Sequence, residues 1–204
     1  DAGGQNGIKV QISGNYAYIV TQGASQNIIA VDISNPKNIT EKSSFSLQSN
    51  PNSLAISGNY AYISSAHSNE EMQVINISDP AVMLKVGAYN AQGSTKANGI
   101  DVSGSTAYLV RSSSNQDEFF TLDISSPASP SLRSSMNLSS SANEVVKMGN
   151  YAYVATDDSG GELKVINVTN PGSLSTKGTY NITGNINLLT IAGFGNTVLA
   201  GGSN

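Results

Sequence analysis

The chain contains no cysteine and no tryptophan, and its 204 residues include a single histidine. Without cysteine it has no disulfide, no thiolate metal site and no thiol nucleophile. The histidine, His67, lies in a polar stretch, and one histidine is too few for a three-histidine metal site. We interpret it as a solvated surface residue, and we expect no enzymatic activity, no catalytic residue and no cofactor.

Charge is also scarce, since only 12% of the residues are charged and the net charge is −4. This acidic balance argues against a nucleic-acid partner, which requires a basic surface. No apolar run approaches the roughly 20 residues that span a bilayer, so we expect no membrane insertion within this segment. Ser, Thr, Asn and Gly supply the polarity, which is common in extracellular and cell-surface proteins, and we expect that location. Because the sequence opens at Asp1, we interpret it as a processed or excised segment.

One phrase recurs along the chain. It reads Ser-Gly-Asn-Tyr-Ala-Tyr-Ile around Gly14, and variants surround Gly58, Gly104, Gly149 and, in faded form, Gly195. A period of about 45 residues filled with strand patterns is typical of β-propeller blades. The Gly-Asn pair predicts a tight turn between two strands, because both residues tolerate a positive φ.

A second phrase alternates with the first and ends at Pro36, Pro80, Pro127 and Pro171. Proline cannot donate to a strand ladder, so each of these residues predicts the end of a strand and a turn. Together the two phrases divide each repeat into four strands, named A to D in chain order; in the first repeat these are residues 8–12, 16–20, 28–34 and 39–47. No segment has a helical period with caps, so we expect no helix.

The sequence therefore predicts one all-β domain over residues 1–204, a β-propeller built from four complete four-stranded blades and a half blade. The expected blades cover residues 8–47, 53–90, 98–138 and 144–182. The half blade, residues 186–200, consists of strands A and B alone.

The two alternating phrases resemble the LVIVD repeat over almost the whole chain, from about Ile8 to Ala200. That family is similar to YVTN-type and other surface propellers. The resemblance implies a secreted or surface protein without assigned catalysis, and it carries structural residues only.

The half blade leaves three alternatives open. The chain is a fragment of a larger, seven-bladed propeller, or it closes on itself with fewer blades, or a neighbouring subunit completes the half blade by strand addition. The last alternative makes a head-to-tail contact and predicts a self-associating structural module. A second function remains open, in which the variable B–C and D–A loops bind a protein or a glycan.

Several acidic residues are weak site candidates. Asp157, Asp158 and Glu162 share a glycine-containing loop that could hold a cation, although an ordinary hairpin explains it better. The pairs Glu70–Glu71 and Asp117–Glu118 occupy one repeat position, where they form either an acidic rim or, as we prefer, scattered surface charge.

Other repeated residues indicate structure. The tyrosines of strand B (Tyr18, Tyr62, Tyr108 and Tyr153) predict core packing. Asp32 and Asp123, with Asn76 and Asn167 as counterparts, are expected to bond to backbone at strand ends. Five Asn-x-Ser/Thr sequences mark possible glycosylation acceptors if the chain passes through a glycosylating pathway: Asn38, Asn76, Asn137, Asn167 and Asn181.

Overall fold

The computed structural model describes residues 6–23, 27–184 and 186–203, and the described chain forms strands, turns and loops without a helix. The strands build four four-stranded antiparallel sheets and one two-stranded sheet, each with its strands in chain order. The predicted all-β propeller architecture of four blades and a half blade is thereby confirmed.

The strands have the following bounds. Blade 1 contains β1 (Asn6–Ser13), β2 (Tyr16–Gln22), β3 (Ile28–Asp32) and β4 (Thr40–Phe45). Blade 2 contains β5 (Pro51–Ser57), β6 (Tyr60–Ser65), β7 (Met72–Asn76) and β8 (Leu84–Tyr89). Blade 3 contains β9 (Ala97–Ser103), β10 (Thr106–Arg111), β11 (Phe119–Asp123) and β12 (Ser131–Met136). Blade 4 contains β13 (Ala142–Met148), β14 (Tyr151–Thr156), β15 (Leu163–Asn167) and β16 (Ser175–Tyr180). The half blade contains β17 (Asn187–Phe194) and β18 (Thr197–Ser203).

The A–B turn repeats with the same backbone conformation in every blade. The φ of its glycine is +58° at Gly14 and +56° at Gly58. In the other three copies it also lies between +56° and +59°. This left-handed conformation strains residues with a side chain, which explains why glycine recurs there.

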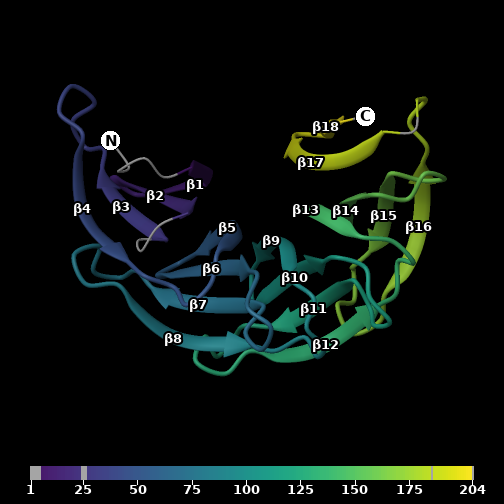
Figure 1. Cartoon of the computed structure of the whole chain (residues 1–204), viewed down its shortest axis with the longest axis horizontal. Helices are drawn as coiled ribbons and strands as arrows, with labels where there is room; N and C mark the ends of the chain where they lie inside the picture. Colours follow the sequence, from purple (N-terminus) through teal and green to yellow (C-terminus); the bar gives the residue numbers. More distant parts are fainter. Residues whose placement is uncertain (1–5, 24–26, 185, 204) are drawn as a thin grey trace.

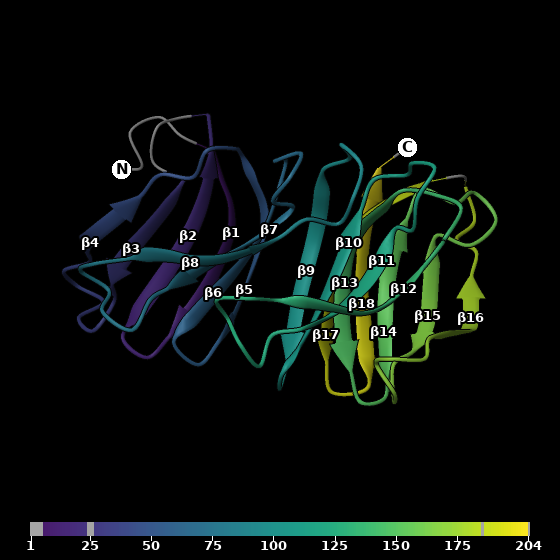
Figure 2. The same cartoon turned by 90° about the horizontal axis from the view of Figure 1, so that it is seen from below.

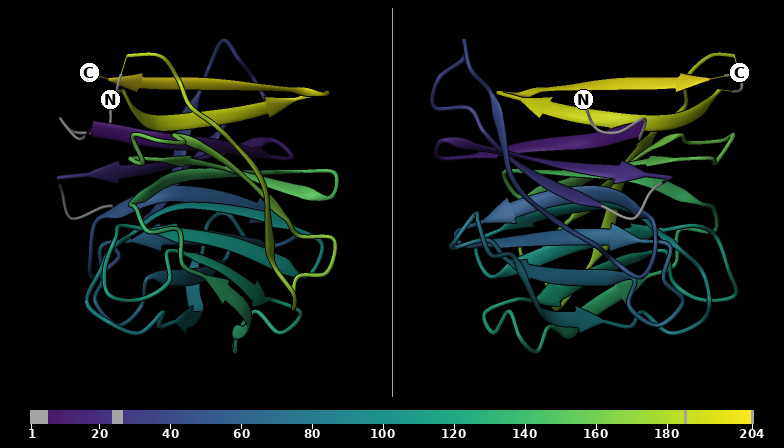
Figure 3. Two further views of the ribbon diagram at one scale, coloured as in Figure 1. Left: turned by 90° about the vertical axis from the view of Figure 1, so that its right-hand side faces the viewer. Right: turned by 60° about the vertical axis from the view of Figure 1, so that its left-hand side comes forward.

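The blades stand side by side in an open arc (Figure 1). The A strands line its inner side, where β1 contacts β5, β5 contacts β9, β9 contacts β13, and β13 contacts β17. Figure 2 shows the blades from below, following one another from blade 1 to blade 4. Figure 3 places the β17–β18 hairpin at the open side of the arc.

Apolar cores lie between successive blades rather than within them. Tyr18, Tyr62 and Tyr108 are each 2% exposed in these cores, which confirms the predicted role of the tyrosines in packing. Alanine alternates with tyrosine on strand B, and Ala61 and Ala107 are fully buried, so neighbouring sheets approach closely. Because a single blade cannot bury both of its faces, the stack itself is the folded unit.

A repeated asparagine ties each blade to the next. The Asn52 side-chain amide donates to the carbonyl of Ala97 at 2.7 Å, Asn98 donates to Ala142 at 2.9 Å, and Asn143 donates to Leu188 at 2.9 Å. Each bond satisfies a backbone carbonyl at the start of the following A strand and fixes the offset between two sheets.

Candidate assembly interface

One repeat position shows how the arc ends at its N-terminal side. Leu54 and Ile100 occupy this position in blades 2 and 3 and are 0% and 3% exposed, because the preceding blade covers them. Their counterpart in blade 1, Val10, is 56% exposed. Its strand neighbours Ile8 and Ile12 are also exposed, at 38% and 65%. These three residues form what we call the N-terminal end face.

The C-terminal side shows the complementary situation. Leu199 in β18 stands where the other blades have the buried strand-B tyrosines, yet it is 63% exposed. Leu189 and Phe194 of β17 are 49% and 84% exposed. These three residues form the C-terminal end face. Leu188 and Ile191 alternate with them and are buried against blade 4, so the half blade is covered on one face only.

The two end faces are therefore the two halves of the interface that recurs between all the blades. Within one chain they lie on opposite sides of the opening and do not close a ring (Figure 1). The alternative in which the chain closes on itself with fewer blades is thus wrong for the described structure. The apolar end faces remain available for other blades.

A group of charged residues lies at the centre of the arc. Glu144 in blade 4 accepts from Lys9 Nζ of blade 1 at 2.9 Å and from Ser53 Oγ of blade 2 at 3.4 Å. Asp101 accepts the backbone N–H groups of Val102 and Lys147 at 2.8 and 2.7 Å. Lys9, Asp101 and Glu144 line one cavity of about 270 Å³.

Burial determines the electrostatics of this centre. Desolvation raises the pKa of Glu144 while Lys9 lowers it, and desolvation likewise raises the pKa of Asp101 against its two backbone bonds. Glu144 of blade 4 bonds to blades 1 and 2, and Asp101 of blade 3 bonds to blade 4. The two carboxylates therefore connect separate blades across the arc. Sequence reasoning missed this centre, because nothing in the chain order brings Lys9 near Glu144.

We expect the substitution Lys9→Met to destabilise the fold by about 2 kcal/mol at neutral pH, because it leaves Glu144 without its countercharge. The folded pKa of Glu144 then rises further above the unfolded value. Its ionisation costs stability as pH rises through the folded pKa, so the loss should shrink toward acid pH. Urea unfolding at two pH values measures this difference. Lys37→Met, in the exposed turn after β3, is the control, and equal losses for the two variants would contradict the prediction.

In the acidic pairs of the B–C loops, Glu70 and Asp117 are half-buried, whereas the second residue of each pair is not the surface charge that both interpretations predicted. Glu71, Glu118 and Glu162 are fully buried. Each accepts a backbone N–H beyond strand D of its own blade, and these donors are Ala91, Leu138 and Ile182 at 2.8–2.9 Å. In blade 1 the side chain of Asn27 accepts from Leu47 at 2.8 Å. These residues thus join the two ends of a C–D hairpin, and there is no acidic rim that includes them.

The three acidic residues of the candidate cation loop each contact a different partner. Asp158 pairs with Lys164 at 2.5 Å, which lowers the pKa of Asp158. Asp157 accepts from Asn143 at 2.6 Å, and Glu162 is the buried residue described above. Among residues 6–23, 27–184 and 186–203, no three His, Cys, Asp or Glu side chains are grouped to hold a metal ion.

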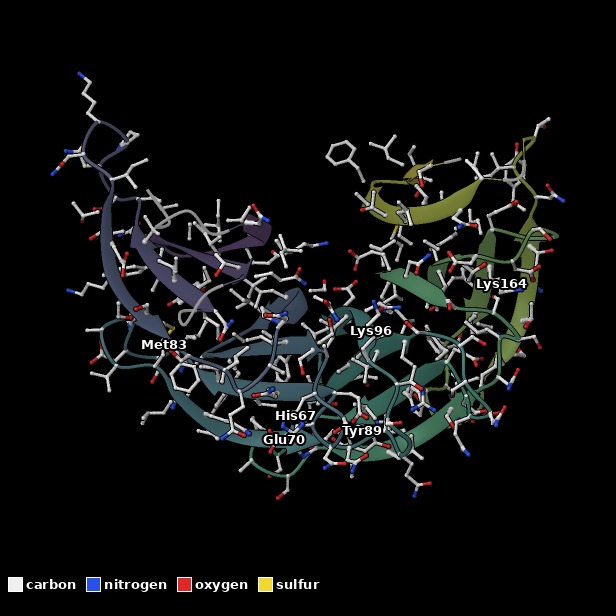
Figure 4. The ribbon with its side chains drawn as sticks, in the orientation of Figure 1. His67, Glu70, Met83, Tyr89, Lys96 and Lys164 are labelled. Atoms are coloured by element: carbon white, nitrogen blue, oxygen red, sulfur yellow. The ribbon has the colours of Figure 1, made fainter. Side chains whose placement is uncertain are left out.

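His67 and Glu70 lie in the loop between β6 and β7 (Figure 4). His67 Nδ1 accepts the backbone N–H of Asn69 at 3.1 Å, and Glu70 forms an ion pair with Lys85. These contacts hold the loop together locally.

The turns after strand C follow the sequence prediction. Asp32 and Asp123 each accept the backbone N–H two residues ahead, from Ser34 and Ser125 at 2.9 Å. The side-chain hydroxyls of Ser34 and Ser125, followed by these backbone bonds, lower the pKa of both carboxyls. Asn76 and Asn167 accept in the same way at 2.9 and 3.0 Å. The bond ends strand C at Asp32 rather than at residue 34.

The sequons fall into two groups. Asn38, Asn137 and Asn181 are exposed, whereas Asn76 and Asn167 are half-buried in the turns after strand C. The exposed group therefore offers the better acceptors. In the part of the chain that the structure describes, no helix is long and apolar enough to cross a membrane.

Blades of four antiparallel strands, packed face to face with their A strands inward, define a β-propeller. Within that class the LVIVD repeat profile matches residues 6–46, 50–91, 94–138 and 139–182, and the chain belongs to the LVIVD repeat family. A comparison with curated proteins gives no match.

Solved structures share the fold at low identity. A functionally unknown protein from Desulfotomaculum acetoxidans DSM 771 is 19% identical, with a TM-score of 0.71 over 90% of this chain and 57% of that one. A protein from Lactobacillus plantarum is 14% identical, with a TM-score of 0.70 over 84% of this chain and 55% of that one. The computationally designed Ika8 protein is 14% identical, with a TM-score of 0.69 over 96% of this chain. The chain spans 55% of the length of Ika8.

Proposed function

We propose that this chain is a non-enzymatic structural module of an extracellular or cell-surface assembly. Its C-terminal end face packs on the N-terminal end face of another copy, so that copies join head to tail. The observation that carries the proposal is the pair of unequal apolar faces, each of which matches one half of the interface found between the blades. The polar, weakly charged composition supports the proposed location.

The energetics favour such a contact. The position of Val10 is buried in every internal interface. The position of Leu199 is a buried tyrosine in the first three interfaces and a half-buried one, Tyr153, in the fourth. Burying one such side chain stabilises by about 1.5–3 kcal/mol. The two end faces together contribute several of them, which is comparable with the association cost of about 4–15 kcal/mol. We expect reversible association of moderate affinity. Because the contact is heterologous, it generates a ring or a filament according to the rotation between copies.

The same end faces fit the blades of a longer polypeptide. In such a protein they would receive blades from the same chain, and the module would form part of a larger propeller.

Light scattering across a dilution series tests the proposal, and we expect species larger than the 21.1 kDa monomer that dissociate on dilution. Val10→Asp and Leu199→Asp should each be monomeric when studied alone, because each removes one of the two end faces that the head-to-tail contact requires. Val82→Asp alters an equally exposed valine in the turn before β8, at 58% exposure, and should leave association intact.

Mixing the two variants separates a head-to-tail contact from a symmetric one. Val10→Asp keeps its C-terminal end face and Leu199→Asp keeps its N-terminal end face, so an equal mixture should form one-to-one dimers and stop there. A wild-type chain that stays monomeric at all concentrations would refute the proposal. A mixture that forms no dimer would refute the head-to-tail contact.

A further inference from the structure

The proline turn between strands C and D contacts the preceding blade at one repeat position. Ser43 of blade 1 donates to the carbonyl of Pro80 at 2.6 Å. In blade 2 the same position is Gly87, and a Cβ there would lie 2.3 Å from the carbonyl oxygen of Pro127. The contact of blade 3 with blade 4 is similar, since Thr121 donates to the carbonyl of Pro171 at 2.6 Å.

Blade 4 has the same position without the contact. Gly178 pairs with Val165 as Gly87 pairs with Val74, so the two glycines are equivalent in register. A Cβ at Gly178 would meet nothing within 4 Å, because the half blade has no proline turn. Gly178 thus stands at a position where glycine is needed if the backbone of a proline turn approaches closely. In the described chain no proline turn lies against it.

The strand-C side chains of blade 4 are also incompletely covered. Leu163 and Val165 are half-buried, whereas Met72 and Val74 at the same positions of blade 2 are fully buried. The half blade covers the A and B strands of blade 4 and leaves β15 and β16 uncovered toward the opening (Figure 1).

The free edge of β18 differs from the other free edges of the arc. Each outer strand carries a charged residue that discourages pairing, and these are Glu41 and Lys42 in β4, Lys85 in β8, Arg133 in β12 and Lys177 in β16. β18, by contrast, has neither charge nor proline, and no charged residue occurs from Gly178 to the end of the sequence. An unprotected edge of this kind is suited to strand addition.

We propose that β18 and the uncovered face of blade 4 form an acceptor site for one strand–proline turn–strand hairpin of the repeat type, supplied by a second polypeptide. Its first strand pairs antiparallel with β18, as strand C pairs with strand B in all four complete blades. Its proline carbonyl lies against Gly178, and its apolar side chains cover Leu163 and Val165. The proposal rests on the proposed function in that both require an incomplete end of the arc, but it uses a different surface from the end faces.

A peptide with the sequence of residues 118–138 is the matched probe, because this hairpin of blade 3 is the one whose proline carbonyl lies on Gly87. We expect saturable one-to-one binding to the full chain, measured by fluorescence anisotropy of the labelled peptide. Gly178→Val should weaken binding about tenfold or more, because the added side chain occupies the place of the carbonyl. Gly172→Ala, in the exposed turn of the same blade, should bind like the wild type. Hydrogen exchange should show new protection of the β18 amides.

The binding is measured in the Val10→Asp background, which disables stacking of copies, so that failure of the proposed function and failure of this inference are distinguishable. If the peptide binds but the wild-type chain does not self-associate, the acceptor site is supported and the proposed function is refuted. No binding, or equal binding to Gly178→Val and to a scrambled peptide, would overturn the acceptor site. Protection of β18 that disappears on dilution without any peptide would assign the edge to β18 of a second copy, and not to a C–D hairpin, and would overturn the acceptor site as well.

Discussion

Gly87→Ala is expected to destabilise the chain by about 3 kcal/mol or more. The new Cβ would lie 2.3 Å from the carbonyl oxygen of Pro127 and 3.1 Å from two backbone atoms of Ala128. Backbone atoms cannot rotate away as a flexible side chain can, so blades 2 and 3 must separate. The interface that yields is the one that buries Met72 and Val74 against blade 3.

Thermal and urea unfolding measure this effect, and a loss of this size lowers the melting temperature of a chain of this length by about 6–12 °C. Gly178→Ala is a closely matched control, since it changes the same register position in blade 4. Its Cβ meets no atom within 4 Å, and we expect a change within about 0.5 kcal/mol. Similar losses in the two variants would show that the strand, and not the contact with the proline turn, requires glycine.

The repeats made most of the architecture predictable. The spacing of Gly14 and its counterparts located the A–B turns, and the spacing of Pro36 and its counterparts located the C–D turns. Both signals are local, since turn conformation depends on a few adjacent residues. Counting strands from these turns was enough to predict the half blade after blade 4.

The contacts between blades were less accessible, because they depend on how far the sheets are offset. Glu71 was assigned to the surface because its neighbours in the loop are polar. The signal that could have corrected this was its recurrence as Asn27, Glu118 and Glu162 directly before strand C. Lys9 and Glu144 do occupy one repeat position, five residues before the turn glycine of their blades, but they differ in charge. Their strands are separated by two blades in sequence, and the curvature of the arc brings them together.

Arg111 is another residue that repetition could have revealed. The position of Arg111, seven residues after the turn glycine, is a small hydroxyl residue in the other complete blades, namely Thr21, Ser65 and Thr156. Arg111 is fully buried there. Its guanidinium donates to the carbonyls of Ala91 and Gln92 at 3.1 and 2.6 Å and to that of Asp117 at 2.7 Å, and it lies 4.9 Å from the centre of the Phe120 ring. It thereby joins the loop that leaves blade 2 to the B–C loop of blade 3.

Replacing Arg111 with methionine, which keeps much of its volume, should cost about 3–5 kcal/mol. The variant leaves three carbonyls without this donor, one buried and two partly buried, and it removes the positive charge that lowers the pKa of Glu71. Burial raises the pKa of Glu71, and without Arg111 it would rise further. Arg111→Lys keeps the charge but not the planar set of donors, so an intermediate loss is expected.

The pH dependence separates the two contributions in Arg111→Met. A carboxyl whose folded pKa lies above its unfolded value contributes stability that is complete below the unfolded pKa and is lost as pH rises through the folded pKa. The part of the loss due to Glu71 should therefore be present near neutral pH and fade toward about pH 4, where the carboxyl is protonated in both states. The part due to the unpaired carbonyls should not change. Urea unfolding at both pH values would detect the difference, and the companion change Glu71→Gln should remove it. A loss independent of pH would mean that Arg111 acts through its hydrogen bonds to the loops alone.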